Sequence, residues 1–477
     1  MINKHYFLKN LFLILGVGIL PLYAAAQNQK NDQRPNIILV MLDDAGWADV
    51  GFTGCNDIVK TPELDKMAKD GLIFNRFYAA SAVCSPTRGS CLTGRNPYRY
   101  GVYTYHLPLK HEEITLPEIL KDAGYRTGHF GKWHLGDIEK GKGKYGEKGV
   151  YGPPGDHGFE KWYSIWNIAP TWDPYDPKNF LDALNQPNKD TNRLMPDYRH
   201  YYDNGKKVLD SLTGSTPKII MDHALDFMEN SHNKKSPFFC VIWFNTIHTP
   251  IIGGPQYLAM YKGLDPQLQT YYAAMTAMDH EIGRLRKSLR NLGIEQNTLI
   301  MFTSDNGPKT KVGGSAGPFR GEKRSLYEGG VRMPSLAEWP GKIIAGTSTS
   351  YPSVTSDYLP TILDILNLSM PDDRPLDGTS LLPVLLGKEQ SLRPSPIGFQ
   401  YSGQQSWTDN QYKLYRADQE KARFELYDLL NDPYEKKDIS DKYPKVVERM
   451  KKELEAWVES CRNSDSGADY PQTTDKL

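Results

Sequence analysis

Polar residues with chemically useful side chains follow four apolar segments of the chain. Asp43-Asp44 comes directly after one segment and Asp305-Asn306 after another, while Lys132 with His134 and then His248 follow the other two. Carboxylate and amide oxygens are hard ligands that suit Ca²⁺ or Mg²⁺ rather than zinc. Histidine and lysine can transfer protons or contact anions. These residue types therefore indicate a site that binds a divalent cation and acts on a negatively charged ester.

The elements that must position these residues are visible as apolar segments with helical patterns between them. We expect strands over 37–42, around 128–130, over 238–244 and over 298–302, and helices over 62–69, 116–122, 217–229 and 267–292. Continuous apolar strands that alternate with helices predict a mostly parallel sheet covered on both faces. Ligands of such sheets bind beyond the carboxyl ends of the strands, so the four polar groups should meet at one edge.

The segment Cys84-Ser85-Pro86-Thr87-Arg88 adds a sulfur atom and a cation. Pro86 is well placed as the first residue of a short helix, which would put Cys84 at the positive end of that helix. Arg88 lies four residues on and so shares a helix face with Cys84.

With these motifs in place, the chain resembles the type I sulfatases of the alkaline phosphatase superfamily. The segment Cys84 to Arg88 is similar to their C-x-P-x-R signature, and further blocks follow in the family's order over nearly the whole chain. They include Asn36 to Asp44, Leu92 to Arg95, Gly124 to Gly136, Ser304 to Gly307 and Gly321 to Pro334. The resemblance implies an α/β, alkaline-phosphatase-like fold. This fold has a large mixed, mostly parallel sheet sandwiched by helices, and a smaller C-terminal subdomain with an antiparallel sheet and a helix.

The resemblance also implies the cofactor chemistry. In that family the signature cysteine is oxidised to formylglycine, an aldehyde that is hydrated in the resting site, by a formylglycine-generating maturation enzyme. One Ca²⁺ per chain would be held by Asp43, Asp44, Asp305, Asn306 and an oxygen of the modified Cys84. A hydrated aldehyde has two hydroxyl oxygens, of which one attacks sulfur and the other is deprotonated to expel sulfate.

The catalytic residues implied by the resemblance are Cys84, Arg88, Lys132, His134, His248 and Lys323. Arg88 and Lys132 would anchor the formylglycine and the sulfate oxygens, and His134 would contact the formylglycine hydroxyl. His248 and Lys323 would contact sulfate and the leaving oxygen, with His248 as the general acid. A sulfuric ester hydrolase is the function that these roles imply.

Two other functions stay open from the sequence. One is a phosphoester or phosphonate hydrolase on the same scaffold, because a fold does not fix a function. The other is a non-enzymatic glycan-binding protein, for which the 29 tyrosines and 9 tryptophans could supply stacking faces. The rates of aryl sulfate and aryl phosphate hydrolysis distinguish a sulfatase from the first alternative. The mass of the Cys84 peptide distinguishes it from the second.

Composition limits the partners of the chain. The 477 residues carry 57 basic and 57 acidic side chains, and a zero net charge disfavours a nucleic-acid binder. Five cysteines are too few for a disulfide framework, and the pairing of Cys55, Cys91, Cys240 and Cys461 stays open. Mean hydropathy is −0.56, and past the first 25 residues no apolar segment is long enough to span a bilayer.

The N-terminus has the pattern of a secretory signal peptide over residues 1–26. Lys4 and Lys9 precede an apolar stretch from Leu11 to Leu22, and three alanines follow before Gln27. The pattern predicts export to the periplasm or the exterior, with no membrane span after cleavage, and the alternative is an uncleaved membrane anchor. We expect a bacterial source.

The rest of the chain divides into two expected domains. The catalytic domain covers 27–388, with an insertion at 137–215 that shapes the substrate site. A C-terminal subdomain covers 389–477, with a helix over 444–457 and a disordered tail from Ser464.

The insertion is rich in aromatic residues, namely His157, Trp162, Trp166, Trp172 and Tyr175. Together with export, this predicts a sulfated carbohydrate as substrate: a glycosaminoglycan, a mucin-type glycan or an algal glycan. An inserted loop can close a pocket around a terminal sugar, so we expect exo action. The residues that contact the sugar, and the hydroxyl that carries the sulfate, are not specified by the sequence.

Overall fold

The computed structural model describes residues 34–139, 151–176, 200–388, 392–420 and 422–470. The expected signal peptide at 1–26 lies outside these residues. Among the described residues, no helix is long and apolar enough to cross a membrane. All five cysteines are described and none forms a disulfide; Cys55 is exposed and the other four are buried.

The strands of the main sheet are β1 (Asn36–Leu42), β2 (Leu72–Tyr78), β3 (Arg126–Lys132), β4 (Lys161–Ile165), β5 (Tyr201–Asp203), β6 (Lys206–Lys207), β7 (Phe238–Trp243), β8 (Thr298–Ser304), β9 (Arg332–Glu338), β10 (Thr347–Thr349) and β11 (Ser353–Val354). A second sheet contains β12 (Ile397–Tyr401), β13 (Gln404–Thr408), β14 (Tyr412–Arg416) and β15 (Glu425–Asp428).

The α-helices are α1 (Pro62–Asp70), α2 (Cys84–Thr93), α3 (Leu116–Asp122), α5 (Thr216–Asn233), α6 (Pro255–Leu258), α7 (Pro266–Asn291), α8 (Glu328–Val331), α9 (Tyr358–Leu366), α10 (Leu382–Leu385) and α11 (Pro444–Asp465).

The centre of the main sheet is parallel and its flanks are mixed. The strand order is β10-β2-β9-β8-β1-β7-β3-β4-β5-β6, with β11 also paired to β2. β1 pairs in parallel with β7 on one side and β8 on the other, and β3 continues the parallel run to β4. The expected large mixed, mostly parallel sheet is confirmed. Because β1, β3, β7 and β8 run in the same direction, their carboxyl ends lie along one edge.

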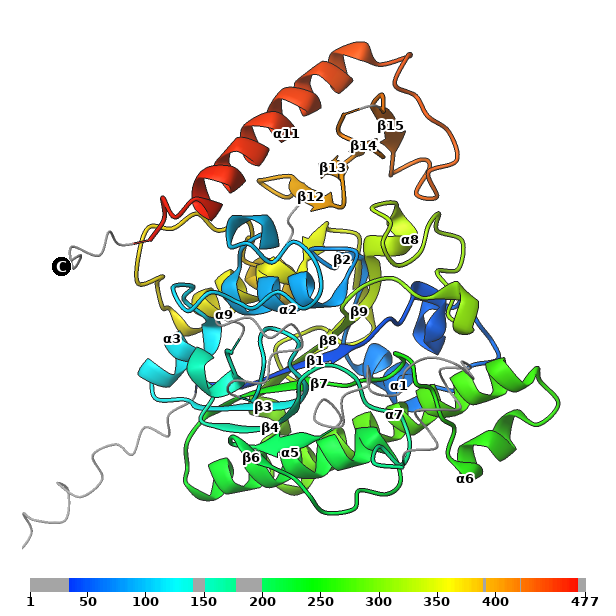
Figure 1. Ribbon diagram of the computed structural model, residues 1–477, viewed down its shortest axis with the longest axis vertical. Helices are drawn as coiled ribbons and strands as arrows, with labels where there is room; N and C mark the ends of the chain where they lie inside the picture. Colours follow the sequence, from blue (N-terminus) through cyan, green and yellow to red (C-terminus); the bar gives the residue numbers. More distant parts are fainter. Residues whose placement is uncertain (1–33, 140–150, 177–199, 389–391, 421, 471–477) are drawn as a thin grey trace, which may run out of the picture. The chain divides into compact units, whose positions relative to one another are not determined.

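Helices cover both faces of this sheet, and alternate residues of β1 face opposite layers (Figure 1). Ile37, Leu39 and Met41 pack into the layer that contains α2, α3 and α9. Ile38, Val40 and Leu42 pack into the layer that contains α1, α5 and α7. Burial of side chains on both faces explains why β1 is apolar from Ile37 to Leu42, without polar alternation.

Seven of the eleven main-sheet strands in the described part of the chain were not predicted from the sequence, and in β2, β4 and β9 the local pattern is mixed. β2 contains Asn75 and Arg76, and β9 runs antiparallel between β2 and β8. β4 lies inside the 137–215 segment, where periodicity is weak, yet it extends the parallel run beside β3. Part of that segment therefore belongs to the main sheet and is not purely a surface insertion.

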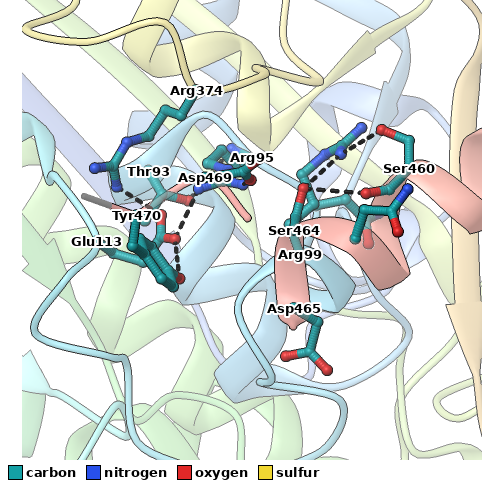
Figure 2. Close-up of polar contacts among 12 residues, drawn as sticks. Thr93, Arg95, Arg99, Glu113, Arg374, Ser460, Ser464, Asp465, Asp469 and Tyr470 are labelled. Carbon is teal, nitrogen blue, oxygen red and sulfur yellow. Dashed lines mark hydrogen bonds and ion pairs between the residues drawn. The ribbon is translucent and has the colours of Figure 1, made fainter. Parts of the chain in front are cut away.

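The C-terminal helix continues beyond its expected end. We expected a helix over 444–457 and a disordered tail from Ser464, but α11 runs to Asp465 and Ser464 is buried. Figure 2 shows why: Arg99 donates hydrogen bonds to Ser460 and Ser464, and Asp469 pairs with the buried Arg95. The polar side chains that suggested disorder are the partners of buried arginines. Residues 471–477 of the expected tail lie outside the described residues.

Candidate active site

Two pairs of adjacent polar residues, at the ends of the neighbouring strands β1 and β8, form the centre of the site. The backbone N–H of Asp44 donates to Asp305 Oδ1 at 3.1 Å, and Asn306 Nδ2 donates to Asp44 Oδ1 at 2.7 Å. Asp44 has a positive φ of 64°, a conformation that aspartate tolerates better than most residues. The strands thus place three carboxylates and one amide within contact of one another, and all four side chains are buried.

Several oxygens of this cluster lack a hydrogen-bond donor among the described residues: Asp43 Oδ1, Asp44 Oδ2 and Asn306 Oδ1. Buried polar atoms without a partner are rare and call for an explanation such as an ion. One ligand atom from each of Asp43, Cys84 and Asp305 lies within 4.8 Å of the others. Hard oxygens at such a spacing fit Ca²⁺ or Mg²⁺.

Cationic side chains surround the carboxylates. Lys132, at the end of β3, donates from Nζ to Asp43 Oδ2 at 2.7 Å. Arg88, on α2, donates to Asp305 Oδ2 from Nη2 at 2.6 Å and from Nε at 3.1 Å. Lys323 binds Asp44 and lies 3.5 Å from Cys84 Sγ. The arrangement pairs each carboxylate with a cation and still leaves oxygens free.

The electrostatic balance differs among the three carboxylates. Burial alone would raise the pKa of the Asp43 carboxyl, but Lys132 and other neighbouring charges hold it below its ordinary value. Burial and the nearby Asp43 raise the pKa of Asp305 to about 6. Three acids crowded together in a low-dielectric interior repel one another, and a divalent cation would relieve this repulsion.

Cys84 is the first residue of α2, and the local sequence explains how the helix is held. Thr87 Oγ1 accepts a hydrogen bond from the Ser81 N–H and donates to the Ser81 carbonyl. Gly89 faces the Tyr100 hydroxyl, where a Cβ would lie only 2.7 Å from that oxygen. The helix begins two residues before Pro86, so Pro86 lies within the first turn but is not its first residue. Arg88 shares a face with Cys84, as expected.

The Cys84 thiol is a poor nucleophile in this setting. Burial, the dominant cause, raises its pKa to about 11, and the Lys132 and Lys323 charges do not offset it. A thiolate is the reactive form of cysteine, so the unmodified side chain is protonated near neutral pH.

Both expected histidines reach the same space. His134 follows β3 and its Nε2 lies 3.0 Å from Nδ1 of His106. His248 follows β7; its Nδ1 lies 2.7 Å from the Thr249 carbonyl, and its Nε2 lies 3.7 Å from Asp44 Oδ2. Burial lowers the pKa of His134 well below its ordinary value and that of His248 to about 4. Every candidate residue named from the sequence therefore converges on one site.

The sequence analysis missed two residues of this site. His106 contacts His134 and stacks on Trp166, with ring centroids 5.0 Å apart. Lys309 Nζ lies 4.0 Å from Asp44 Oδ2. Lys309 could have been suspected because it follows Asp305-Asn306 by only a few residues, whereas nothing in its own segment marks His106.

The aromatic residues of the 137–215 segment do not form a common surface. His157 is fully buried and Trp162 is 4% exposed, so neither can stack on a sugar. Trp172 contacts Gly254, and Tyr175 donates to the Val208 carbonyl. Of the five, Trp166 is the one that packs against a candidate site residue, His134, with ring centroids 5.9 Å apart.

Comparison with known proteins gives a consistent result. A family model described as Sulfatase matches residues 35–368, and one described as N-sulphoglucosamine sulphohydrolase, C-terminal, matches residues 317–460. The N-acetylgalactosamine-6-sulfatase of Rattus norvegicus is 34% identical over 403 residues, covering 80% of this chain and 71% of that protein. Arylsulfatase G of Rattus norvegicus is 33% identical over 391 residues, covering 75% and 70%.

A solved structure agrees with these relatives. The crystal structure of Ps i-CgsB in complex with k-i-k-neocarrahexaose has a TM-score of 0.79 and 30% identity, covering 92% of this chain and 96% of that one. The matched regions include the strand ends and the helix that carry the site. The chain belongs to the sulfatase family of the alkaline phosphatase superfamily and is a sulfuric ester hydrolase.

Proposed function

We propose that this enzyme removes sulfate from a sulfated carbohydrate, with one bound Ca²⁺ per chain and a formylglycine made from Cys84. The observation that carries the proposal is a buried thiol whose sulfur lies 3.5 Å from Lys323 Nζ, beside carboxylate oxygens that lack a hydrogen-bond partner among the residues described. The similarity to an N-acetylgalactosamine-6-sulfatase and to a structure that holds a neocarrahexaose supports a carbohydrate substrate.

The residues present fit a calcium ion. Asp43, Asp44, Asp305 and Asn306 would hold it, together with the modified Cys84, because their oxygens are hard donors and several lack another partner. When bound, Ca²⁺ supplies positive charge that polarises the sulfate ester and orients it.

The modification of Cys84 supplies the nucleophile. Hydrated formylglycine offers one hydroxyl for attack on sulfur and a second whose deprotonation releases sulfate. Formylglycine suits this position better than cysteine, because a buried thiol beside a hard cation would be a weak nucleophile and a weak ligand. A formylglycine-generating enzyme is the partner that this step requires.

The cationic side chains and histidines of the site would stabilise charge and transfer protons during the reaction. Arg88, Lys132 and Lys323 are fixed by carboxylates and would oppose the negative charge that develops on the sulfuryl oxygens. His134 is held by His106 at 3.0 Å and would contact the hydroxyl of the nucleophile. His248 directs Nε2 towards the site, where it would give a proton to the leaving oxygen. Because burial lowers the pKa of His248 to about 4, this role requires the bound anionic ester to raise that pKa.

We propose exo action on a terminal sugar of a glycosaminoglycan, mucin-type or algal glycan. The 137–215 segment supports this in part, because β4 and Trp166 bring it beside the site. Sulfate release from mono- and disaccharides is then expected, and release from a long polymer alone would contradict exo action.

The proposed function is tested by mass spectrometry and kinetics together. Protein matured in a host with a formylglycine-generating enzyme should show the mass of an aldehyde or its hydrate, in place of –CH2SH, in the Cys84 peptide. The same protein should release sulfate from a panel of sulfated sugars. Cys84→Ser should be inert, with Cys91→Ser as the control for loss of a buried cysteine on the same helix. An intact thiol in active protein, or faster hydrolysis of aryl phosphate than of aryl sulfate, would refute the mechanism.

Export remains part of the proposal. A cleaved signal at 1–26 would place the enzyme in the periplasm or outside a bacterial cell, where sulfated glycans are encountered. N-terminal sequencing of the secreted protein should give a start near Gln27.

A further inference from the structure

A cavity of about 420 Å³ lies among the loops beside the candidate active site. Its lining comes from the loop after β7, the loop after β8 and the loop before α8: Thr249, Lys309, Lys311, Val312, Glu322, Lys323 and Arg324. Four of these seven side chains are cationic and one is acidic, so the cavity is suited to an anion.

The cavity is continuous with the candidate active site through two shared lysines. Lys323 lines the cavity while its Nζ binds Asp44 and approaches Cys84 Sγ at 3.5 Å. Lys309 also lines it, with Nζ 4.0 Å from Asp44 Oδ2. A molecule that occupies the active site can therefore extend into the cavity without leaving contact with the protein.

Two further cations of the cavity, Lys311 and Arg324, have no role in the candidate active site. Among the described residues, neither Lys311 nor Arg324 has a carboxylate within 4.0 Å. The cavity's one acid, Glu322, is already engaged, because its carboxylate accepts from the Thr310 N–H at 3.0 Å and from the Thr310 hydroxyl. Glu322 keeps its negative charge and lies close enough to Lys311 for that ammonium group to contribute to lowering its pKa. The lining still carries more positive than negative side chains, so the route out of the site has an excess of positive charge.

The backbone that carries Arg324 is fixed from both sides. Its N–H donates to the Ala82 carbonyl at 3.0 Å, and its carbonyl accepts from Gln404 Nε2 at 2.8 Å. The guanidinium lies 5.7 Å from the centroid of the Tyr105 ring. These hydrogen bonds fix the backbone of Arg324, while its side chain is exposed and can reach an anion in the cavity.

We propose that this cavity is a subsite for a second anionic group, a sulfate or a carboxylate, on the same glycan that carries the scissile sulfate. Lys311 and Arg324 bind that group, while Lys309 and Lys323 border both sites. The substrate would then be a glycan with at least two negative groups close together. This inference rests on the proposed function and narrows its substrate class.

Synthetic compounds that hold two anionic groups at graded distances test the subsite without knowledge of the sugar. Alkyl monosulfates, α,ω-alkanediol bis-sulfates and ω-carboxyalkyl sulfates of matched chain length are titrated by calorimetry into the Cys84→Ser protein with Ca²⁺ present. The quantity compared is the ratio of the affinities for the doubly and singly charged compound at each length. At the best length, we expect a second anion to improve affinity about tenfold, as for a charge-assisted hydrogen bond.

The variant Lys311→Gln/Arg324→Gln should reduce this ratio to less than about twofold. The matched control is Lys287→Gln/Arg290→Gln, which removes the same charge from exposed positions on α7 and should leave the ratio unchanged. Comparable thermal midpoints of the two variants exclude misfolding as the cause. The bis-sulfate and carboxyalkyl arms show which anion the subsite prefers.

Two results would overturn the subsite. One is a ratio near one at every chain length, and the other is an equal fall of the ratio in both double variants, which would indicate a general charge effect. Failure of the proposed function has a different signature, namely absence of binding of the alkyl monosulfates and of inorganic sulfate themselves.

Discussion

Lys132 is the residue on which the charge state of Asp43 most depends. Its ammonium group is the largest of the charges that counter the burial of Asp43, and the two groups are 2.7 Å apart with neither exposed. Removal of one member of a buried ion pair leaves the other uncompensated, which is more costly than the loss of an exposed pair.

We predict that Lys132→Met lowers kcat by about 10²- to 10³-fold, the usual loss for one group that stabilises developing charge. Sulfate release at saturating substrate measures it. Lys218→Met, at an exposed lysine of α5, is the control and should keep kcat within about twofold of wild type. Retention of full kcat in Lys132→Met would remove Lys132 from the proposed mechanism.

Substitution of Asp305 provides a direct test of calcium binding. If calcium binds the folded state and not the unfolded state, a hundredfold excess over Kd should raise the free energy of unfolding by about 2.7 kcal/mol. The thermal midpoint of unfolding should rise accordingly. Addition of a chelator should reverse the rise. Asp305→Asn should show a much smaller difference with and without calcium, because it removes a charged ligand and half of the pair with Arg88.

The difference with and without calcium, rather than the midpoint itself, is the readout, since Asp305→Asn also disturbs Arg88. An identical midpoint of the wild-type protein in calcium and in chelator would contradict a calcium site. Differential scanning calorimetry makes the measurement without any assay of activity.

At the scale of elements, the end of α11 is anchored to the segment that follows α2. Arg95 comes two residues after α2 and is fully buried, with Glu113 at 2.8 Å and Asp469 as its carboxylate partners. The Tyr470 hydroxyl donates to the same Glu113 at 2.6 Å (Figure 2). The helix that carries Cys84 is thus braced by the far end of the chain.

We predict that Asp469→Ala destabilises the protein by about 1–3 kcal/mol, because a buried guanidinium loses a charged acceptor. Urea unfolding measures the change. Asp441→Ala is the matched control: its side chain is 91% exposed, so its unfolding midpoint should match that of wild type. Equal stability of the two variants would mean that residues after α11 do not brace α2.

At the scale of the whole molecule, a buried ionic cluster joins the two sheets. Lys413 on β14 lies 3.0 Å from Glu328 on α8 and 2.9 Å from Glu435. Glu328 also contacts Arg332 of β9 and the hydroxyl of Tyr78 of β2. The C-terminal sheet is therefore tied to the edge of the main sheet by charges that no solvent reaches.

This cluster makes stability depend on pH. Burial is the main cause that raises the pKa of Glu435 to about 7 from its ordinary value near 4.5; Glu328 adds to it, and Lys413 opposes it. Between these two pH values the folded state binds more protons than the unfolded state, so stability is highest below about 4.5 and falls as pH rises to about 7. The loss is on the order of 3 kcal/mol.

We predict that Glu435→Gln removes most of this pH dependence, because glutamine does not ionise. The free energy of unfolding in urea is measured for wild type and variant at a pH below 4.5 and at a pH above about 7. The change between the two pH values is then compared between the two proteins. This comparison separates Glu435 from Tyr78, Arg76, Arg332 and the other groups that face the cluster. Glu455→Gln on α11, which is 55% exposed, serves as the control. An unchanged slope in Glu435→Gln would show that Glu435 is ionised throughout.

The sequence by itself determined the parts of this protein that are encoded locally. Apolar segments that end in Asp43-Asp44 and Asp305-Asn306 specify buried strands with ligands at their carboxyl ends, and the Cys84 segment specifies a short helix with Arg88 one turn away. These signals need only the period of a strand or helix and the direction of a parallel sheet, so the layered fold and the polar residues at the strand ends could be predicted. Lys323 was named only through the family resemblance, and His106 and Lys309 were missed.

The tertiary structure decided everything that depends on distance across the chain. It inserted β9 antiparallel between β2 and β8, placed His106 against His134, and set Lys311 and Arg324 around a cavity beside Asp44. It also turned an apparently disordered tail into the partner of Arg95. A side chain far away in sequence can become a partner only through packing, and packing is a property of the folded molecule that no local pattern records.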